Sequence, residues 1–159
     1  MSKAERRDPD SVDDVFGEDH QVLGALLERL RSAIPERSPE ALATLEAFTL
    51  GLRAHMSWEE ELLFPAVFAH ATSAQKRSIE SLEIDHERLR ETLSSLHSSL
   101  AAGDFATART LADWLETLLR GHNYDEEHGV YVEADQYLTE ELRRRLIEQF
   151  RHASRKPRP

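Results

Sequence analysis

Six ionisable residues of this 159-residue sequence occupy positions where a helical protein normally places apolar ones. They are His20, His55, Glu59, His86, His122 and Glu126. Around them the apolar residues recur at three- and four-residue steps, which is the spacing of one face of an α-helix. Burying an imidazole or a carboxylate is costly unless the group is paired or bound to a metal ion. The pattern therefore predicts a metal site inside a helical protein.

The six residues also belong to an internal repeat. The dipeptide Asp-His occurs at 19–20 and at 85–86, and the pattern His-x-x-x-Glu-Glu occurs at 55–60 and at 122–127. The chain therefore consists of two helical hairpins, each supplying one histidine and then a His-x-x-x-Glu pair. Residues four apart share a helix face, so both groups of a pair point the same way. Counted from the hairpin turns at ~1.5 Å rise per residue, the groups of each hairpin lie within ~5 Å of one level.

Proline, glycine and capping residues divide the chain into helices. We expect a first helix from about residue 14 to 33, and a second that begins after Ser38-Pro39 and ends or kinks at Pro65. A third helix should follow a break at 69–73 and end at Gly103-Asp104. A fourth should end at Gly129, and a short one should cover about 139–150.

Short connections between four long helices predict an all-α fold. We expect an antiparallel up-down-up-down four-helix bundle with a short extra C-terminal helix. The expected division is a flexible N-terminal arm at 1–13, the bundle at 14–132, and a short helix with a basic tail at 133–159.

The composition excludes several classes of protein. The chain has 20 Lys and Arg against 30 Asp and Glu, a net charge of −10 that disfavours a nucleic-acid partner. It has no cysteine, which excludes disulfides, a thiol nucleophile and iron–sulfur clusters. No segment approaches the ~20 apolar residues of a membrane span, so no membrane partner is expected. The N-terminus lacks an apolar signal core, so we expect a cytoplasmic protein.

Four imidazoles and two carboxylates suit two metal ions better than one. In the simplest arrangement each metal takes the two histidines of one hairpin, and both glutamates bridge the metals. This donor set fits iron, manganese or zinc, and non-haem iron suits a carboxylate-bridged pair. With a bridging oxo or hydroxo group, each metal keeps an open position for dioxygen or nitric oxide. Glu60 and Glu127 flank the six and could hydrogen-bond the histidines, and Tyr124 and Tyr131 are weaker candidates for that role.

The combined pattern D-H…H-x-x-x-E-E…L-F-P…D-H…H-x-x-x-E-E resembles the hemerythrin-like (HHE cation-binding) family of di-iron four-helix bundles, over roughly residues 14–132. The resemblance implies two iron ions held by the six residues. Hemerythrins that carry oxygen have a further histidine one turn along the third helix, where this chain has Arg90. The chain is more similar to the branch with two histidines per iron, whose members are associated with sensing iron, oxygen or nitric oxide, or with repairing iron centres.

Three functions follow from these expectations, and no catalytic residue is assigned. We favour a non-haem di-iron protein that binds or senses a small ligand (oxygen or nitric oxide) or iron. One alternative is a di-iron oxidase or peroxidase, which needs a substrate pocket beside the metals. The other is a metal-stapled structural adaptor. The remaining histidines are expected to lie outside the site: His70, His97, His128 and His152.

Overall fold

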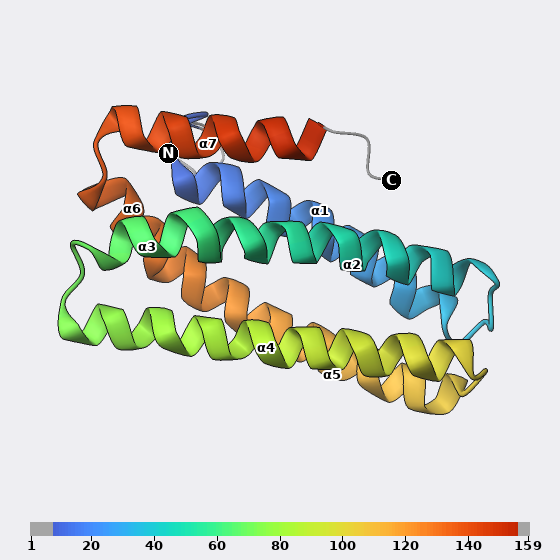
Figure 1. Cartoon of the computed structure of the whole chain (residues 1–159). Helices are drawn as coiled ribbons and strands as arrows, with labels where there is room; N and C mark the ends of the chain where they lie inside the picture. Colours follow the sequence, from blue (N-terminus) through green and yellow to red (C-terminus); the bar gives the residue numbers. More distant parts are fainter. Residues whose placement is uncertain (1–7, 156–159) are drawn as a thin grey trace, which may run out of the picture.

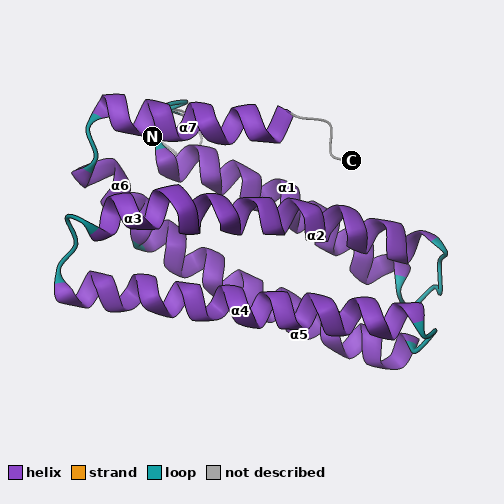
Figure 2. Ribbon diagram, in the orientation of Figure 1, coloured by secondary structure: helices purple, strands orange, loops and turns teal. Residues whose placement is uncertain are grey.

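The structure, a computed structural model, describes residues 8–155, and all the regular elements over that range are helices. Figures 1 and 2 show them as long rods joined by short turns. The elements are α1 (Val12–Ala33), α2 (Glu40–Trp58), the π-helical segment η2 (Glu59–Leu63), α3 (Phe64–Phe68), α4 (Ser73–Ala101), α5 (Phe105–His128), α6 (Val130–Tyr137) and α7 (Glu140–Arg155). Over the same range, no helix has both the length and the apolar character that a membrane crossing requires.

Short polar side chains start three of the long helices. The Ser11 and Asp104 side chains accept hydrogen bonds from the backbone N–H groups three residues on. Thr72 and Gln75 form a reciprocal capping box at the start of α4. Gly103, with φ +73°, supplies the left-handed turn between α4 and α5. The expected breaks near 69–73, 103–104 and 129 are therefore present.

The four long helices pack side by side, α1 against α2 and α5, and α4 against α5 and α2. The turns 34–39 and 102–104 lie at one end of the molecule, and the loop 69–72 lies at the other (Figure 1). The apolar core forms two clusters. The turn-end cluster is built around Leu27, Leu30, Leu45, Phe48, Leu93 and Leu115. The far-end cluster is built around Phe16, Phe64, Leu82, Tyr131, Ile147 and Phe150.

Helices α1 and α4 pass from one cluster to the other, and their histidines lie at the crossover. On α1, for example, Phe16 belongs to the far-end cluster and Leu23 to the turn-end cluster, with buried His20 between them. On α4, Leu82 and Leu89 flank His86 in the same way. The bundle therefore holds its polar residues in one layer between two apolar ones.

The structure adds detail to two sequence expectations at the N-terminus. Helix α1 begins at Val12 rather than near residue 14, because Ser11 caps it. The expected flexible arm is anchored at its C-terminal end, where Asp135 accepts hydrogen bonds from the Ser11 hydroxyl and the Val12 backbone N–H. Residues 1–7 of that arm lie outside the described residues.

Pro65 neither ends nor sharply breaks the second helix, because α2 runs through η2 directly into α3. In η2 the backbone N–H of Phe64 donates to the Glu59 carbonyl, five residues back. Proline lacks an N–H and clashes with a carbonyl one turn before it, and a wider π turn relieves both problems. Pro65 then sits in the first turn of α3, where proline is tolerated.

The C-terminal segment contains more helix than expected. One short helix at about 139–150 was predicted, whereas α6 and α7 together cover most of 130–155. Helix α7 places Ile147 and Phe150 in the far-end cluster, which explains why it is held against the bundle. Residues 156–159 of the predicted basic tail lie outside the described part. These bounds are those of helices. The division of the chain into arm, bundle and C-terminal part at 13/14 and 132/133 stays a prediction.

Candidate metal centre

All six predicted residues meet at one place in the bundle. Helix α1 supplies His20, α2 supplies His55, η2 supplies Glu59, α4 supplies His86, and α5 supplies His122 and Glu126. All six are buried, and both glutamates are fully inaccessible to solvent. Their donor atoms form two overlapping sets of four, within each of which all atoms lie within 4.8 Å of one another. Both sets include the two glutamates, so each carboxylate faces two histidine pairs.

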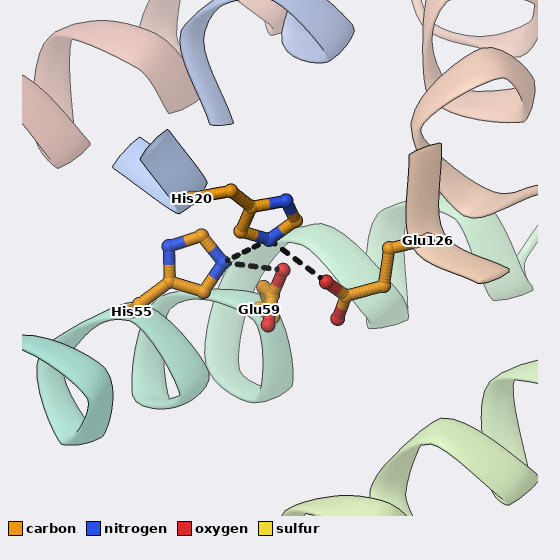
Figure 3. A group of neighbouring side chains, drawn as sticks. All are labelled: His20, His55, Glu59 and Glu126. Carbon is orange, nitrogen blue, oxygen red and sulfur yellow. Dashed lines mark hydrogen bonds and ion pairs between the residues drawn. The ribbon is translucent and has the colours of Figure 1, made fainter. Parts of the chain in front are cut away.

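The first set, called here the N-terminal donor group, contains His20, His55, Glu59 and Glu126 (Figure 3). The Nε2 atoms of His20 and His55 are 3.2 Å apart. Oε2 of Glu126 lies 3.0 Å from the His20 Nε2, and Oε1 of Glu59 lies 3.0 Å from the His55 Nε2. Each histidine therefore has one carboxylate oxygen beside it.

The second set, the C-terminal donor group, contains His86, His122, Glu59 and Glu126. The Nε2 atoms of its histidines are 3.1 Å apart. The other oxygens of the same carboxylates serve this group, with Glu126 Oε1 2.8 Å from the His122 Nε2 and Glu59 Oε2 3.3 Å from the His86 Nε2. Each carboxylate thus turns one oxygen toward each group, as a bridging ligand must.

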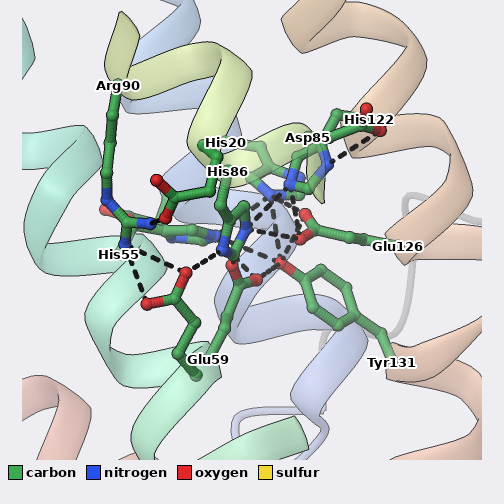
Figure 4. Close-up of polar contacts among 12 residues, drawn as sticks. His20, His55, Glu59, Asp85, His86, Arg90, His122, Glu126 and Tyr131 are labelled. Atoms are coloured by element: carbon green, nitrogen blue, oxygen red, sulfur yellow. Dashed lines mark hydrogen bonds and ion pairs between the residues drawn. The ribbon is translucent and has the colours of Figure 1, made fainter. Parts of the chain in front are cut away.

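The opposite ring nitrogens, Nδ1, contact carboxylates that surround the centre (Figure 4). Nδ1 of His20 lies 2.8 Å from Glu127, and Nδ1 of His86 lies 2.7 Å from Glu60. Nδ1 of His55 lies 2.7 Å from Asp19. A carboxylate accepts hydrogen bonds, so these Nδ1 atoms carry the proton and donate. The sequence singles out Glu60 and Glu127 because each directly follows one of the two central glutamates, Glu59 and Glu126.

His122, the fourth histidine, is held differently. Its Nδ1 is 3.7 Å from the nearest Asp85 oxygen, too far for a hydrogen bond, and it has no hydrogen-bond partner among the described residues. Sequence reasoning assigned no role to Asp19 or Asp85. The repeated Asp-His dipeptide was the signal that could have found them, because in both copies the aspartate lies beside a histidine of the partner helix.

The donor chemistry fits a pair of cations. Three histidines are protonated on Nδ1, so in their neutral form the Nε2 lone pairs face one another or a carboxylate. Facing lone pairs repel unless a proton or a metal ion lies between them. Two carboxylate oxygens at the centre, Glu59 Oε2 and Glu126 Oε1, also make no hydrogen bond within residues 8–155. Cations would satisfy all these atoms together.

The electrostatics of the metal-free chain point the same way. Burial by itself lowers the pKa of His86, but the carboxylates of Glu126 and Glu59 outweigh it and raise that pKa to about 10. Burial likewise raises the pKa of Glu126, but the charge of His122 holds the pKa well below its ordinary value. The electrostatic potential at the centre is therefore strongly negative. In the metal-free protein this potential favours protons bound to the histidines.

Tyr131 lies at the centre of the site, although the sequence makes it a weaker candidate than Glu60 and Glu127. It is fully buried on α6, and its hydroxyl lies 2.5 Å from Glu59 Oε1 and 3.1 Å from Glu126 Oε2 (Figure 4). Burial, with the charges of Glu126 and Glu59, raises the pKa of its hydroxyl well above 10. Tyr124, the other tyrosine considered, is exposed and stacks on His128 at the surface.

The four histidines expected outside the site, His70, His97, His128 and His152, are all exposed. Arg90, at the position where a further histidine was considered, donates to both oxygens of Glu60 at 2.8 and 2.9 Å. It therefore touches the centre only through the Glu60 carboxylate.

Comparison with protein families gives a match over most of the chain. A model of the Hemerythrin HHE cation-binding domain family matches residues 11–134. No curated protein and no solved structure matches the chain. The matched range spans α1 to α5 and most of α6, and so includes all six predicted residues and Tyr131. The chain therefore belongs to the hemerythrin HHE cation-binding family.

Proposed function

We propose that this chain is a non-haem di-iron protein that binds or senses a small ligand, dioxygen or nitric oxide, or iron itself. One observation supports it above the others: two groups of four buried donors share both carboxylates. A shared carboxylate pair suits two metals a few ångströms apart, and imidazole with carboxylate suits iron more than a hard cation such as Mg²⁺. Zinc or manganese would fit the same donors, so the identity of the metal needs measurement.

The proposal gives each set of residues a role. The four histidines and two glutamates hold the metals, and the outer carboxylates fix the histidine rings with Nε2 inward. The antiparallel up-down-up-down order of the bundle brings the two hairpins face to face, and the short extra C-terminal helix covers the far end. Two iron ions, when bound, would supply open positions for a small ligand and a bridging oxo or hydroxo group. The apolar clusters on either side exclude water from the layer between them.

A groove supports the approach of a small molecule from the α1–α5 side. It has a volume of about 380 Å³, and Gly24, Tyr124 and Glu127 are among its lining residues. The Glu127 carboxylate contacts the His20 ring, so the groove ends one residue away from the proposed metals.

Metal analysis with optical spectroscopy tests the proposal. The protein is purified without added metal, its iron, zinc and manganese are counted, and its spectrum is recorded before and after addition of nitric oxide. We expect about two iron ions per chain and a near-ultraviolet band that changes with nitric oxide. A single zinc per chain with no spectral response would contradict the proposal.

Two further measurements separate the alternatives. Repeated turnover of added peroxide or nitric oxide would identify an oxidase or peroxidase, whereas one stoichiometric spectral change per chain would support binding or sensing. Replacement of iron by zinc distinguishes a structural adaptor, because an adaptor should keep its function with either metal. We also propose a cytoplasmic location, which fractionation of cells that produce the protein tests.

A further inference from the structure

The hydroxyl of Tyr131 has an unusual set of neighbours. It contacts all four members of the N-terminal donor group: Glu59 at 2.5 Å, His20 Nε2 at 3.0 Å, and His55 Nε2 and Glu126 at 3.1 Å each. The side chain is fully buried. The Tyr131 hydroxyl therefore lies within the N-terminal donor group and not at its edge.

These neighbours cannot all be satisfied by a phenol. A phenol has one proton to donate. The carboxylates only accept. In the neutral form of His20 and His55, which is the form that can bind a metal, the Nε2 atoms also accept, because the Nδ1 protons are donated to Glu127 and Asp19. One O–H bond can serve one acceptor, and the other contacts then place lone pairs against lone pairs. A cation among the five atoms would attract every one of them.

The internal repeat shows that this hydroxyl is specific to one half of the centre. Adding 67 to Phe64 gives Tyr131, so the two rings are equivalent positions of the repeat. The Phe64 ring stacks on the ring of His86, with centroids 5.6 Å apart. Phe64 therefore gives the C-terminal donor group an apolar contact. At the equivalent position, Tyr131 gives the N-terminal donor group an oxygen.

Local backbone structure aims Tyr131 at the centre. Helix α5 ends at His128, and Gly129 joins it to α6. A Cβ on Gly129 would lie 2.8 Å from the Asp125 carbonyl oxygen, closer than a side chain tolerates. Glycine thus permits the break that turns α6, and with it the Tyr131 ring, inward.

We propose that Tyr131 is a fifth protein ligand of the metal in the N-terminal donor group. When a metal is bound, its bond to the phenol oxygen would replace the O–H bond, and the proton would leave to solvent with no change of oxidation state. The N-terminal metal then has five protein donors and the C-terminal metal four. The C-terminal metal is therefore the one with more room for an incoming ligand. This inference rests on the proposed di-metal centre.

Spectroscopy of the iron-loaded chain tests the inference. A phenolate bound to ferric iron absorbs visible light by charge transfer, and resonance Raman excitation in that band enhances the phenolate ring vibrations. We expect both signals in the wild-type protein, and their loss in Tyr131→Phe when the two are compared per iron bound. Tyr124→Phe is the matched control, since Tyr124 is exposed, and it should keep both signals.

Each outcome decides something. Wild-type protein with two irons but no phenolate vibrations would overturn the tyrosine ligand while leaving the di-iron proposal intact. Signals that persist in Tyr131→Phe would overturn it too. Wild-type protein that binds no metal would overturn both proposals. If Tyr131→Phe does not fold, the wild-type Raman spectrum still decides, and Phe64→Tyr gives a second check, because a hydroxyl at the equivalent position should add phenolate intensity.

Discussion

The two donor groups each contain two histidines and share the same two carboxylates, yet their surroundings differ. In the N-terminal group both Nδ1 atoms donate to carboxylates, and Tyr131 adds a fifth polar atom. In the C-terminal group one Nδ1 donates to a carboxylate that Arg90 also holds, and the other Nδ1 has no hydrogen-bond partner among the described residues. A sequence repeat can therefore duplicate donors while the residues around them set the two halves apart.

This difference bears on which metal is held more firmly. Carboxylates that hydrogen-bond ligating histidines fix the ring orientation and commonly contribute 10–100-fold to metal affinity. His122 lacks that support, whereas His55 has it from Asp19. We therefore expect the N-terminal group to hold its metal more firmly and the C-terminal group to be the more exchangeable half.

The largest effects should come from removing a histidine of either group. His55→Ala and His122→Ala should each lower the metal content from about two ions per chain toward one or fewer, and lower the melting temperature. Losing the partner of a buried carboxylate typically costs about 3–5 kcal/mol. Metal analysis and thermal unfolding of the same samples measure both effects. His97→Ala, an exposed histidine on α4, is the control and should change neither.

Equal loss of both metals from the two variants would contradict firmer metal binding by the N-terminal donor group. We expect His122→Ala to keep the N-terminal metal, and so to retain the phenolate signal expected of Tyr131. His55→Ala should lose that signal. Full metal content and an unchanged melting temperature in both variants would show that these histidines are not ligands.

A smaller and more selective effect is expected at the paired aspartates. Asp19→Asn removes the negative charge of the carboxylate that lies 2.7 Å from the His55 Nδ1, and should weaken metal binding by about 10-fold or more. Asp85→Asn changes a group 3.7 Å from the His122 Nδ1, and should change affinity by less than about 3-fold. Competition with a chelator measures both. Equal losses would mean that Asp85 closes on His122 once metal is bound.

The smallest effect is expected from Arg90→Gln. Arg90 and Glu60 form an ion pair near the surface, which usually contributes about 0–1 kcal/mol to stability. The melting temperature should therefore fall by about 1–3 °C in the metal-free protein. His86 still contacts Glu60 in this variant, so metal affinity should change little.

The pH dependence gives that prediction its sign. Burial raises the pKa of Glu60, but hydrogen bonds from Arg90 and His86 outweigh it and leave the pKa below 4.5. A carboxyl with a depressed pKa in the folded state stabilises the fold above its unfolded pKa, and loses that contribution as the pH falls through the folded value. The difference between wild type and Arg90→Gln should thus be present at neutral pH and vanish in acid. A difference that grows in acid would argue against the Arg90–Glu60 pair as its source.

Much of the molecule followed from helical periodicity. The apolar steps and the capping residues predicted four long helices and their breaks, because these signals act over a few neighbouring residues. The same periodicity singled out all six central residues, since a histidine or glutamate on an apolar stripe must face inward. The role of those residues as metal ligands stays a prediction until metal is measured.

The sequence by itself determined which side chains face the interior, because that depends on spacing within one helix. Only the tertiary structure decided which groups meet across helices: Glu60 with His86, Asp19 with His55, and Tyr131 with the N-terminal donor group. Those pairings depend on how far each helix is rotated and shifted against its neighbours. The wider turn at η2 alters both, and it has no periodic signal in the sequence.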